Sequence, residues 1–210
     1  MIEFLIDVAS PNAYLADRVL RARGASVAYR PILLGGLFKV TGNAAPMVAY
    51  RSVPNKLAYE MRELARFVEA NGLAAYRMNP AFPVHTVGIM RAATAVARDE
   101  SGDLAPFFER ALAAMWEEGR DLSQESERRA VLTEAGLDAD WILAAAEEQA
   151  IKDALRAATQ AAADRGAFGV PTFFVGDEMW FGKERIEAVL AADAASRSGD
   201  RLETDVTADA

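Results

Sequence analysis

The residues with the clearest chemical potential are Ser10-Pro11-Asn12-Ala13, which stand where an apolar strand gives way to a predicted helix. The backbone N–H groups and the dipole at a helix N-terminus favour an anion such as a thiolate or a carboxylate. The same residues also have an ordinary structural interpretation, because serine is a preferred N-cap and proline suits the first helical position. The two interpretations are compatible, since one hydroxyl can cap the helix and face a ligand.

A second candidate is Gly169-Val170-Pro171-Thr172, where a proline opens a short apolar strand. A proline at the start or edge of a strand needs no functional explanation. A cis Val170–Pro171 bond would instead present the backbone of Val170 to a peptide-like ligand, but only about 5–6% of X-Pro bonds are cis. The residues by themselves leave both alternatives open.

Further polar residues could contribute to a site, and each also has a structural explanation. Asn43 lies in a polar turn, and Lys56 begins a predicted amphipathic helix. Lys183-Glu184 open the last helix, where an acid suits the helix dipole. His85, the only histidine, follows a proline-containing loop, and such a histidine is more often a surface or hydrogen-bonded residue than a catalyst.

The absence of cysteine from the 210 residues limits the chemistry of the chain's own side chains. It excludes disulfides, cysteine-based metal sites and thiol–disulfide exchange by a protein sulfur. A single histidine also excludes multi-histidine zinc sites, and we expect no metal. The net charge is −8, with 23 basic against 31 acidic residues. Because no cluster of lysine and arginine interrupts this acidity, we expect no nucleic-acid partner.

The apolar segments argue against a membrane protein. None approaches the ~18 residues that a bilayer-spanning helix needs. The opening Met-Ile-Glu-Phe-Leu-Ile-Asp carries acids where a signal peptide would need a basic start and an uninterrupted apolar stretch. We therefore expect no membrane contact and a cytoplasmic location.

The elements that would position the candidate residues are strands at both ends of the chain. Residues 2–8 alternate with a period of two and predict a strand, a helix over about 11–23 follows, and residues 27–34 predict a second strand. Near the other end, 170–175 and 178–181 predict a hairpin, followed by a last helix. Two-stranded pieces bury too little apolar surface to be stable alone, so we predict one four-stranded sheet.

The hundred or so residues between the strands are predicted to be helical, apart from a loop over 76–83. The first predicted helix carries Leu57, Met61, Leu64 and Val68 on one face and ends at Asn71-Gly72. Further helices are predicted over 87–98, 106–118 and 125–135. Asp138 is predicted to cap another, and alanine-rich helix with one break continues to Gly166. The fold class is thus α/β with a large inserted all-helical domain.

Three blocks of this chain resemble the 2-hydroxychromene-2-carboxylate isomerases and the kappa-class glutathione transferases. The blocks are Asp7-Val8-Ala9-Ser10-Pro11-Asn12-Ala13-Tyr14-Leu15-Ala16, then Leu34-Gly35-Gly36-Leu37-Phe38-Lys39-Val40-Thr41-Gly42-Asn43 with Pro54-Asn55-Lys56, and Phe168-Gly169-Val170-Pro171-Thr172-Phe173-Phe174-Val175-Gly176-Asp177-Glu178-Met179-Trp180-Phe181-Gly182. The similarity covers about residues 2–192. The third block is closer to the isomerases than to the transferases.

The resemblance implies a DsbA-like, thioredoxin-like domain interrupted by the helical insertion. The implied boundaries are residues 1–45 plus 166–195 for the thioredoxin-like domain and 46–165 for the helical domain. We expect the polar, acidic residues 196–210 to form a disordered tail. The resemblance also implies a homodimer.

The resemblance further implies reduced glutathione as the cofactor, with Ser10 as the catalytic residue whose hydroxyl bonds the glutathione sulfur. The implied cofactor-binding residues are Ser10, Pro11, Asn43, Val170, a cis Pro171, Lys183 and Glu184. The implied substrate-binding residues are Asn12, Lys56 and His85. Relatives usually have Asn or Ser followed by Asp at positions 183 and 184, an aromatic residue at 12 and often asparagine at 85.

The function implied is a glutathione-dependent isomerase in aromatic compound catabolism, which interconverts 2-hydroxychromene-2-carboxylate-like and trans-o-hydroxybenzylidenepyruvate-like compounds. A borrowed thiolate would explain how a chain without cysteine performs thiol chemistry. One alternative is a kappa-like glutathione transferase, which would consume the thiol. Another is a non-catalytic thioredoxin-fold binding protein, against which the joint presence of Ser10 and the Gly-Val-Pro-Thr block argues.

Overall fold

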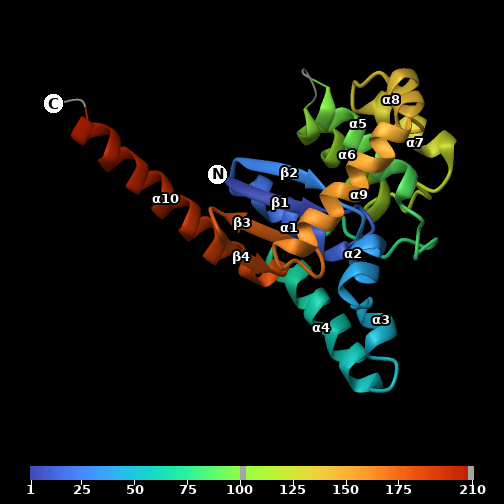
Figure 1. Cartoon of the computed structure of the whole chain (residues 1–210). Coiled ribbons are helices and arrows are strands. Elements are labelled where there is room, and N and C mark those ends of the chain that lie inside the picture. Colours follow the sequence, from blue (N-terminus) through green and yellow to red (C-terminus); the bar gives the residue numbers. More distant parts are fainter. Residues whose placement is uncertain (100–102, 208–210) are drawn as a thin grey trace.

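Both ends of the chain contribute strands to one four-stranded sheet (Figure 1). The computed structural model describes residues 1–99 and 103–207. The strands lie in the order β2-β1-β3-β4, and their bounds are β1 Ile2–Ile6, β2 Val27–Pro31, β3 Thr172–Val175 and β4 Glu178–Phe181. β1 runs parallel to β2 and antiparallel to β3, and β3 forms an antiparallel hairpin with β4. The predicted sheet is confirmed.

The first strand, β1, lies inside the sheet and is buried on both faces. Phe4 pairs with Tyr29 on one side and with Phe173 on the other, and their rings lie 5.8 and 4.8 Å from the Phe4 ring. Leu5, on the opposite face, is only 3% exposed. Helices therefore have to cover both faces of the sheet.

The predicted helices match the structure closely, with shifts of one or two residues at most ends, whereas α2 and α3 were not predicted. Their bounds are α1 Pro11–Ala22, α2 Leu34–Thr41, α3 Pro46–Ala49, α4 Pro54–Ala70, α5 Val87–Arg98, α6 Leu104–Trp116, α7 Glu125–Glu134, α8 Ala139–Ala145, α9 Gln149–Asp164 and α10 Ile186–Thr207, with a short 3-10 helix η1 at Lys183–Arg185. Asp138 caps α8 as predicted, by accepting a hydrogen bond from the Trp141 N–H. The expected break in the alanine-rich region falls between α8 and α9.

The prediction that residues 27–34 form one strand is wrong at its second half. β2 ends at Pro31, and Leu34 begins the helix α2. Gly35-Gly36 suggests a turn in the sequence, but a Cβ at Gly36 would lie 3.4 Å from the Thr159 side chain of α9. Gly36 therefore lies at the contact between α2 and α9, which a local sequence pattern does not reveal.

The first predicted strand is also shorter than expected, because β1 ends at Ile6 rather than at Val8. Residues 7–9 form a turn that leads into α1. The carboxylate of Asp7 accepts a hydrogen bond from the Ala9 N–H at 2.9 Å, which stabilises this turn. The turn places Ser10 directly beyond the end of the sheet.

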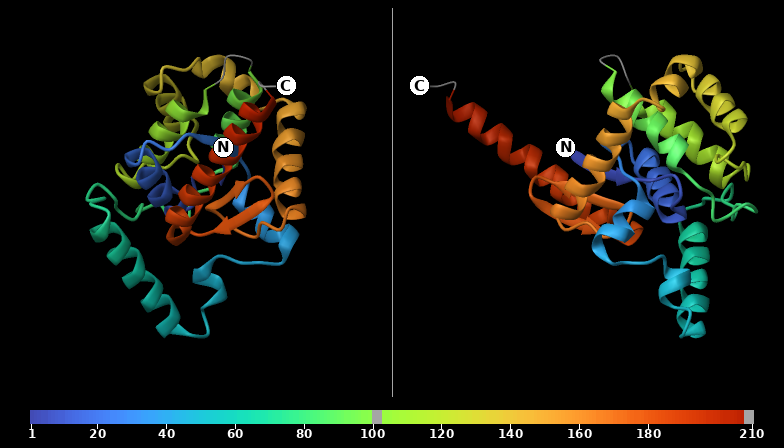
Figure 2. Two further views of the ribbon diagram at one scale, coloured as in Figure 1. Left: turned by 90° about the vertical axis from the view of Figure 1, so that its left-hand side faces the viewer. Right: turned by 45° about the vertical axis from the view of Figure 1, so that its right-hand side comes forward.

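Two helical segments project from the body of the molecule, as Figures 1 and 2 show. One is the pair α3 and α4, and none of the residues of α4 is fully buried. Only the C-terminal half of α4 packs against the core, through Leu64, Phe67 and Val68. The other is α10, whose start contacts β3 and β1 and whose end points away from the sheet.

The prediction of a disordered tail over 196–210 is not what the structure shows, because α10 continues to Thr207. The first turns of α10 are anchored by Ile186 and Val189, both of which are buried. An anchored helix extends easily, since adding a residue is far less unfavourable than starting a helix. An ion pair between Arg197 and Asp193, four residues apart, supports the continuation. Residues 208–210 lie outside the described residues.

Over residues 1–99 and 103–207, no helix combines the length and the apolar character that crossing a bilayer requires.

Candidate active site

Ser10 joins two segments that are far apart in the sequence. Its hydroxyl oxygen caps α1 by accepting a hydrogen bond from the Ala13 N–H at 3.2 Å. The same hydroxyl donates to the carbonyl oxygen of Val170, also at 3.2 Å. Ser10 is 4% exposed and Val170 is 6% exposed. The two candidate motifs of the sequence therefore meet at one hydroxyl group, beside the N-terminus of a helix.

The segment around Val170 is held in place by its own hydrogen bonds. The Val170–Pro171 peptide bond is cis, as the resemblance implies. The Thr172 hydroxyl, which is fully buried, donates to the carbonyl of Gly169 at 2.7 Å. The N–H of Gly182, at the end of β4, donates to the carbonyl of Pro171 at 3.0 Å. These contacts fix the Val170 carbonyl next to Ser10.

Asp7 is a buried acid beside the candidate site that the sequence did not single out. Its side chain is fully buried, and its second carboxylate oxygen accepts a hydrogen bond from the Leu34 N–H at 2.8 Å. The Thr86 side chain is a further hydrogen-bond partner. Burial raises the pKa of Asp7 above its ordinary value, although these hydrogen bonds act in the opposite direction. Its signal in the sequence is an acid at the end of an apolar strand, three residues before Ser10.

The raised pKa of Asp7 predicts a specific pH dependence of stability. The folded state holds the proton more tightly than the unfolded state, so this contribution is greatest below the ordinary pKa of 3.8 and is lost as the pH rises through the folded value. In urea unfolding from about pH 4 to about pH 8, the free energy of unfolding of the wild type relative to Asp7→Asn should fall as the pH rises. A difference that stays constant or grows with pH would contradict the assignment.

Asn43 and Asn12 lie near these segments and differ in their hydrogen bonding. The Asn43 side-chain amide donates to the carbonyl of Phe168 at 2.8 Å, and its oxygen accepts from the Ala44 N–H. Asn43 thus tethers the chain just before Val170. In contrast, the Oδ1 atom of Asn12 is buried and has no hydrogen-bond partner among the described residues. A buried unpaired oxygen is costly to a folded protein. Pro11, at the first position of α1, separates Asn12 from Ser10.

The charge of Lys183 is already paired within the protein. Lys183 is 5% exposed, its ammonium pairs with the Glu184 carboxylate, and it lies 5.3 Å from the centre of the Phe67 ring. The Glu184 side chain, by contrast, is 59% exposed. Of this pair, the acid is therefore the group that faces solvent, and the lysine fixes the C-terminal half of α4 to the end of β4.

Lys56 and His85 are not brought to Ser10 by contacts in the structure. Lys56 lies in the first turn of α4, where its ammonium is 4.7 Å from the Tyr50 ring centre. It precedes Phe67 by eleven residues, or about 16 Å of helix, on the projecting half of α4 (Figure 1). His85 is exposed in the loop before α5. Its neighbour Thr86 is the residue that contacts Asp7.

Aromatic side chains line the other side of the Ser10 turn. The Trp116 indole N–H donates to the carbonyl of Val8 at 2.9 Å. The Tyr76 ring lies between the rings of Trp116 and Tyr14, with centroid distances of 6.2 and 5.8 Å. The residues on both sides of Ser10 therefore contact one aromatic cluster.

A metal site is not part of this arrangement. In the part of the chain that the structure describes, no three or more His, Asp or Glu side chains come together as metal ligands.

Comparisons with known proteins place this architecture in a family. Residues 1–192 match the model of the DsbA-like thioredoxin domain. The chain is 30% identical over 191 residues to 2-hydroxychromene-2-carboxylate isomerase of Sphingobium xenophagum, covering 89% of this chain and 94% of that one. It is 27% identical to glutathione S-transferase kappa 1 of Rattus norvegicus, covering 89% and 88%.

A solved structure agrees with the sequence relatives. A structure of 2-hydroxychromene-2-carboxylate isomerase superposes with a TM-score of 0.73 at 26% identity, and the match covers 98% of each chain. The match includes both the sheet and the inserted helices, so the predicted thioredoxin-like fold with a helical insertion is confirmed. The chain therefore belongs to the family of DsbA-like thioredoxin domains, among relatives named as isomerases and as kappa-class glutathione transferases.

Proposed function

We propose that the protein is a glutathione-dependent isomerase that acts on compounds like 2-hydroxychromene-2-carboxylate. The observation that carries the proposal is the hydrogen bond from the Ser10 hydroxyl to the Val170 carbonyl at the N-terminus of α1. It brings a hydroxyl donor, a helix dipole and a backbone carbonyl acceptor together in a chain that has no cysteine. The relatives named as isomerases support the reaction class.

The residues present fit a small thiol peptide. A peptide N–H could replace the Ser10 hydroxyl as the donor to the Val170 carbonyl, as an added strand pairs with a sheet edge. The Ser10 hydroxyl would then be free to donate to an anion at the α1 N-terminus, which stabilises negative charge. The name of the kappa-class relative supports glutathione as the thiol.

When bound, glutathione would supply a thiolate that adds reversibly to the conjugated double bond of the substrate, so that this bond can rotate. Ser10 would keep the thiol ionised by donating its hydrogen bond to the charged form. Asn43 would act on the ligand indirectly, because its amide holds the Phe168 carbonyl and with it the Val170 segment. Glu184 would receive the amino group at the other end of the peptide, and Lys183 would position that carboxylate.

The nearest alternative is a transferase that forms a stable conjugate, as the kappa-class relative's name suggests. The two reactions differ in the fate of the thiol. An isomerase releases glutathione unchanged, so a small catalytic amount supports many turnovers. A transferase consumes one thiol for each product.

The proposal is tested by titrating the full chain with reduced glutathione in a calorimeter and then assaying trans-o-hydroxybenzylidenepyruvate. We expect binding at or below about millimolar glutathione, which corresponds to a binding free energy of about −4 kcal/mol or more favourable. We also expect turnover without loss of free thiol. Ser10→Ala is the matched variant for turnover. Absence of binding at millimolar glutathione, or stoichiometric thiol loss, would overturn the proposal.

A further inference from the structure

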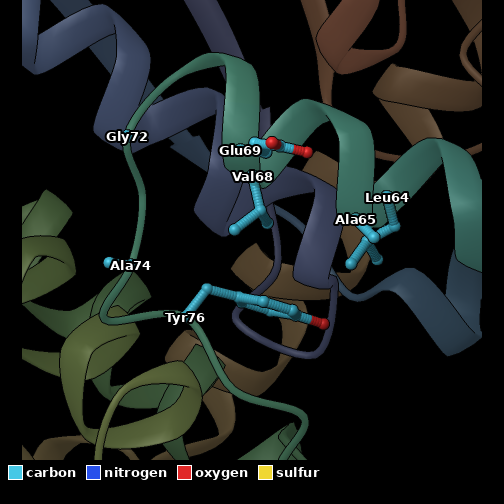
Figure 3. A pocket seen from close by; sticks show the side chains of 7 residues that line it. All are labelled: Leu64, Ala65, Val68, Glu69, Gly72, Ala74 and Tyr76. Carbon is cyan, nitrogen blue, oxygen red and sulfur yellow. The ribbon is translucent and has the colours of Figure 1, made fainter.

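A cavity of about 290 Å³ lies in the helical insertion, where the first turns of α5 and α7 meet the end of α8 (Figure 1). We call it the α8 cavity. Its volume is close to the lower end of the range for small-molecule sites, roughly 300 Å³. Its lining is rich in charge, unlike that of the cavity between α4 and residues 72–76, whose one charged side chain is Glu69 (Figure 3). Within the described residues, the lining of the α8 cavity includes none of those at the candidate active site.

Arg128 lines the α8 cavity with one edge of its guanidinium unused. Its Nη1 atom donates to the carbonyl of Leu122 at 3.2 Å and to that of Ser123 at 2.6 Å. Among residues 1–99 and 103–207, the Nε and Nη2 donors have no hydrogen-bond partner, and no carboxylate lies within ion-pair distance of Arg128. The donors left over are the pair of N–H groups that a carboxylate binds with both of its oxygens.

Gly88, in the first turn of α5, provides the space in which the guanidinium lies. A Cβ atom at Gly88 would be 2.8 Å from the Cζ atom and 2.9 Å from the Nε atom of Arg128. Any larger residue at this position would therefore push the guanidinium away from α5. The two carbonyl contacts and Gly88 together fix the direction in which the unused edge points.

The acids around the α8 cavity are each paired with a cation other than Arg128. The pairs are Arg129 with Asp140 and with Glu125, and Glu147 with Lys152 and with Arg91. Four cations and three acids therefore meet here, and the positive charge without a partner is that of Arg128. The three acids are 66–88% exposed, so water and salt screen them, whereas Arg128 is half-buried and is screened less.

The rest of the lining indicates what the anion would carry. Leu143, Ala144 and Ala146 give the α8 cavity an apolar wall, which favours burial of a short aliphatic group. A planar carboxylate matches the fork of an arginine in bidentate geometry. A dianion would exceed the single unpaired positive charge and would be repelled by the acids nearby.

We propose that the α8 cavity is a binding site for a small aliphatic monocarboxylate, held by the unused edge of the Arg128 guanidinium. The site is separate from the one at Ser10, and the inference does not depend on the proposed function.

The test is calorimetric titration of the full-length protein with isovalerate, a branched aliphatic monocarboxylate. We expect a dissociation constant of about 1 mM or tighter. Arg128→Met should weaken binding by more than about 10-fold, the loss expected for a hydrogen bond to a charged group. The matched control is Arg156→Met, which removes an exposed arginine of α9 that does not line the cavity and should leave the affinity within about twofold.

Two further comparisons keep the test decisive if Arg128→Met does not fold. Gly88→Ala retains the charge of Arg128 and suits a helix better than glycine does, but its Cβ would displace the guanidinium. This variant should bind isovalerate at least about fivefold more weakly than the wild type. The uncharged amide isovaleramide should bind the wild type at least about 10-fold more weakly than isovalerate. Thermal unfolding establishes that each variant is folded.

Three results would overturn the proposal. They are absence of isovalerate binding to the wild type at about 20 mM, unchanged affinity in a folded Arg128→Met or Gly88→Ala variant, and equal affinity for isovalerate and isovaleramide. None of these measurements uses glutathione or turnover. Failure of the α8 cavity to bind the carboxylate would therefore leave the proposed function standing, and absence of glutathione binding would leave the cavity standing.

Discussion

Replacing Ser10 with alanine should lower turnover of trans-o-hydroxybenzylidenepyruvate by about 10- to 100-fold. A hydrogen bond to a charged group is worth about 1.5–3 kcal/mol, and each 1.4 kcal/mol corresponds to about a factor of ten. The loss should appear in kcat more than in glutathione affinity, because Val170 and Glu184 would still hold the peptide. The measurement is steady-state kinetics at saturating glutathione.

A second readout separates loss of chemistry from loss of structure. The pKa of bound glutathione, followed by the ultraviolet absorbance of its thiolate, should rise by about one to two units towards about 8.5, the value of a free cysteine thiol. Loss of the helix cap alone costs about 1 kcal/mol of stability. Asp138→Ala is the control, because it removes a cap hydrogen bond from α8 without touching this site. Turnover of Ser10→Ala at the wild-type rate would show that Ser10 is a cap and nothing more.

Replacing Asp17 with asparagine should lower the free energy of unfolding by about 3–5 kcal/mol, the cost of breaking a buried ion pair. Asp17 is fully buried on α1. One of its oxygens accepts from the Tyr29 hydroxyl at 2.6 Å, and the other pairs with Arg21 at 2.8 Å and with Arg18 at 3.2 Å. Asparagine would remove the buried charge and one acceptor, so that Arg18 would keep only its ion pair with Glu117 and Arg21 its contacts with Glu109 and the Ala105 carbonyl. Urea unfolding at neutral pH measures the loss.

The control for Asp17→Asn is the same substitution at Asp153, an aspartate that pairs with an arginine at the surface. Asp153 pairs with Arg156 at 2.9 Å, but their side chains are 52% and 75% exposed. Asp153→Asn should therefore change stability by less than about 0.5 kcal/mol. If both variants lost the same small amount of unfolding free energy, the buried network that joins α1 to β2 would contribute no more to stability than a surface ion pair. Tyr29→Phe combined with Asp17→Asn should be less destabilising than the sum, because the two residues share a hydrogen bond.

Much of the fold could be predicted because it is specified locally. The alternation of Ile2, Phe4 and Ile6, the cap at Ser10 followed by Pro11, and the cap at Asp138 each depend on neighbours a few residues away. Helix ends and turns obey such short-range rules. The structure reproduces them with small shifts.

The failures have physical causes that lie outside a local window. The helix α2 was not predicted because Gly35-Gly36 indicates a turn, whereas the structure packs Gly36 against Thr159 of α9, 123 residues away. The hydrogen bonds of Asp7 could not be predicted from the sequence, because its partner Leu34 is 27 residues away. The continuation of α10 past Ser196 depends on anchoring of its first turns, not on the composition of its end.

The sequence by itself determined the chemistry that is available to this protein. A chain without cysteine and with one histidine has no thiol of its own, and a serine at a strand–helix junction offers only a hydroxyl and a helix dipole. Only the tertiary structure decided which candidates act together. It joined Ser10 to Val170 across 160 residues, paired Lys183 with Glu184 beside Phe67, and placed Lys56 on the projecting part of α4. Residue types set what a group can do, but packing between distant segments sets which groups meet, because contact distances are not encoded in spacing along the chain.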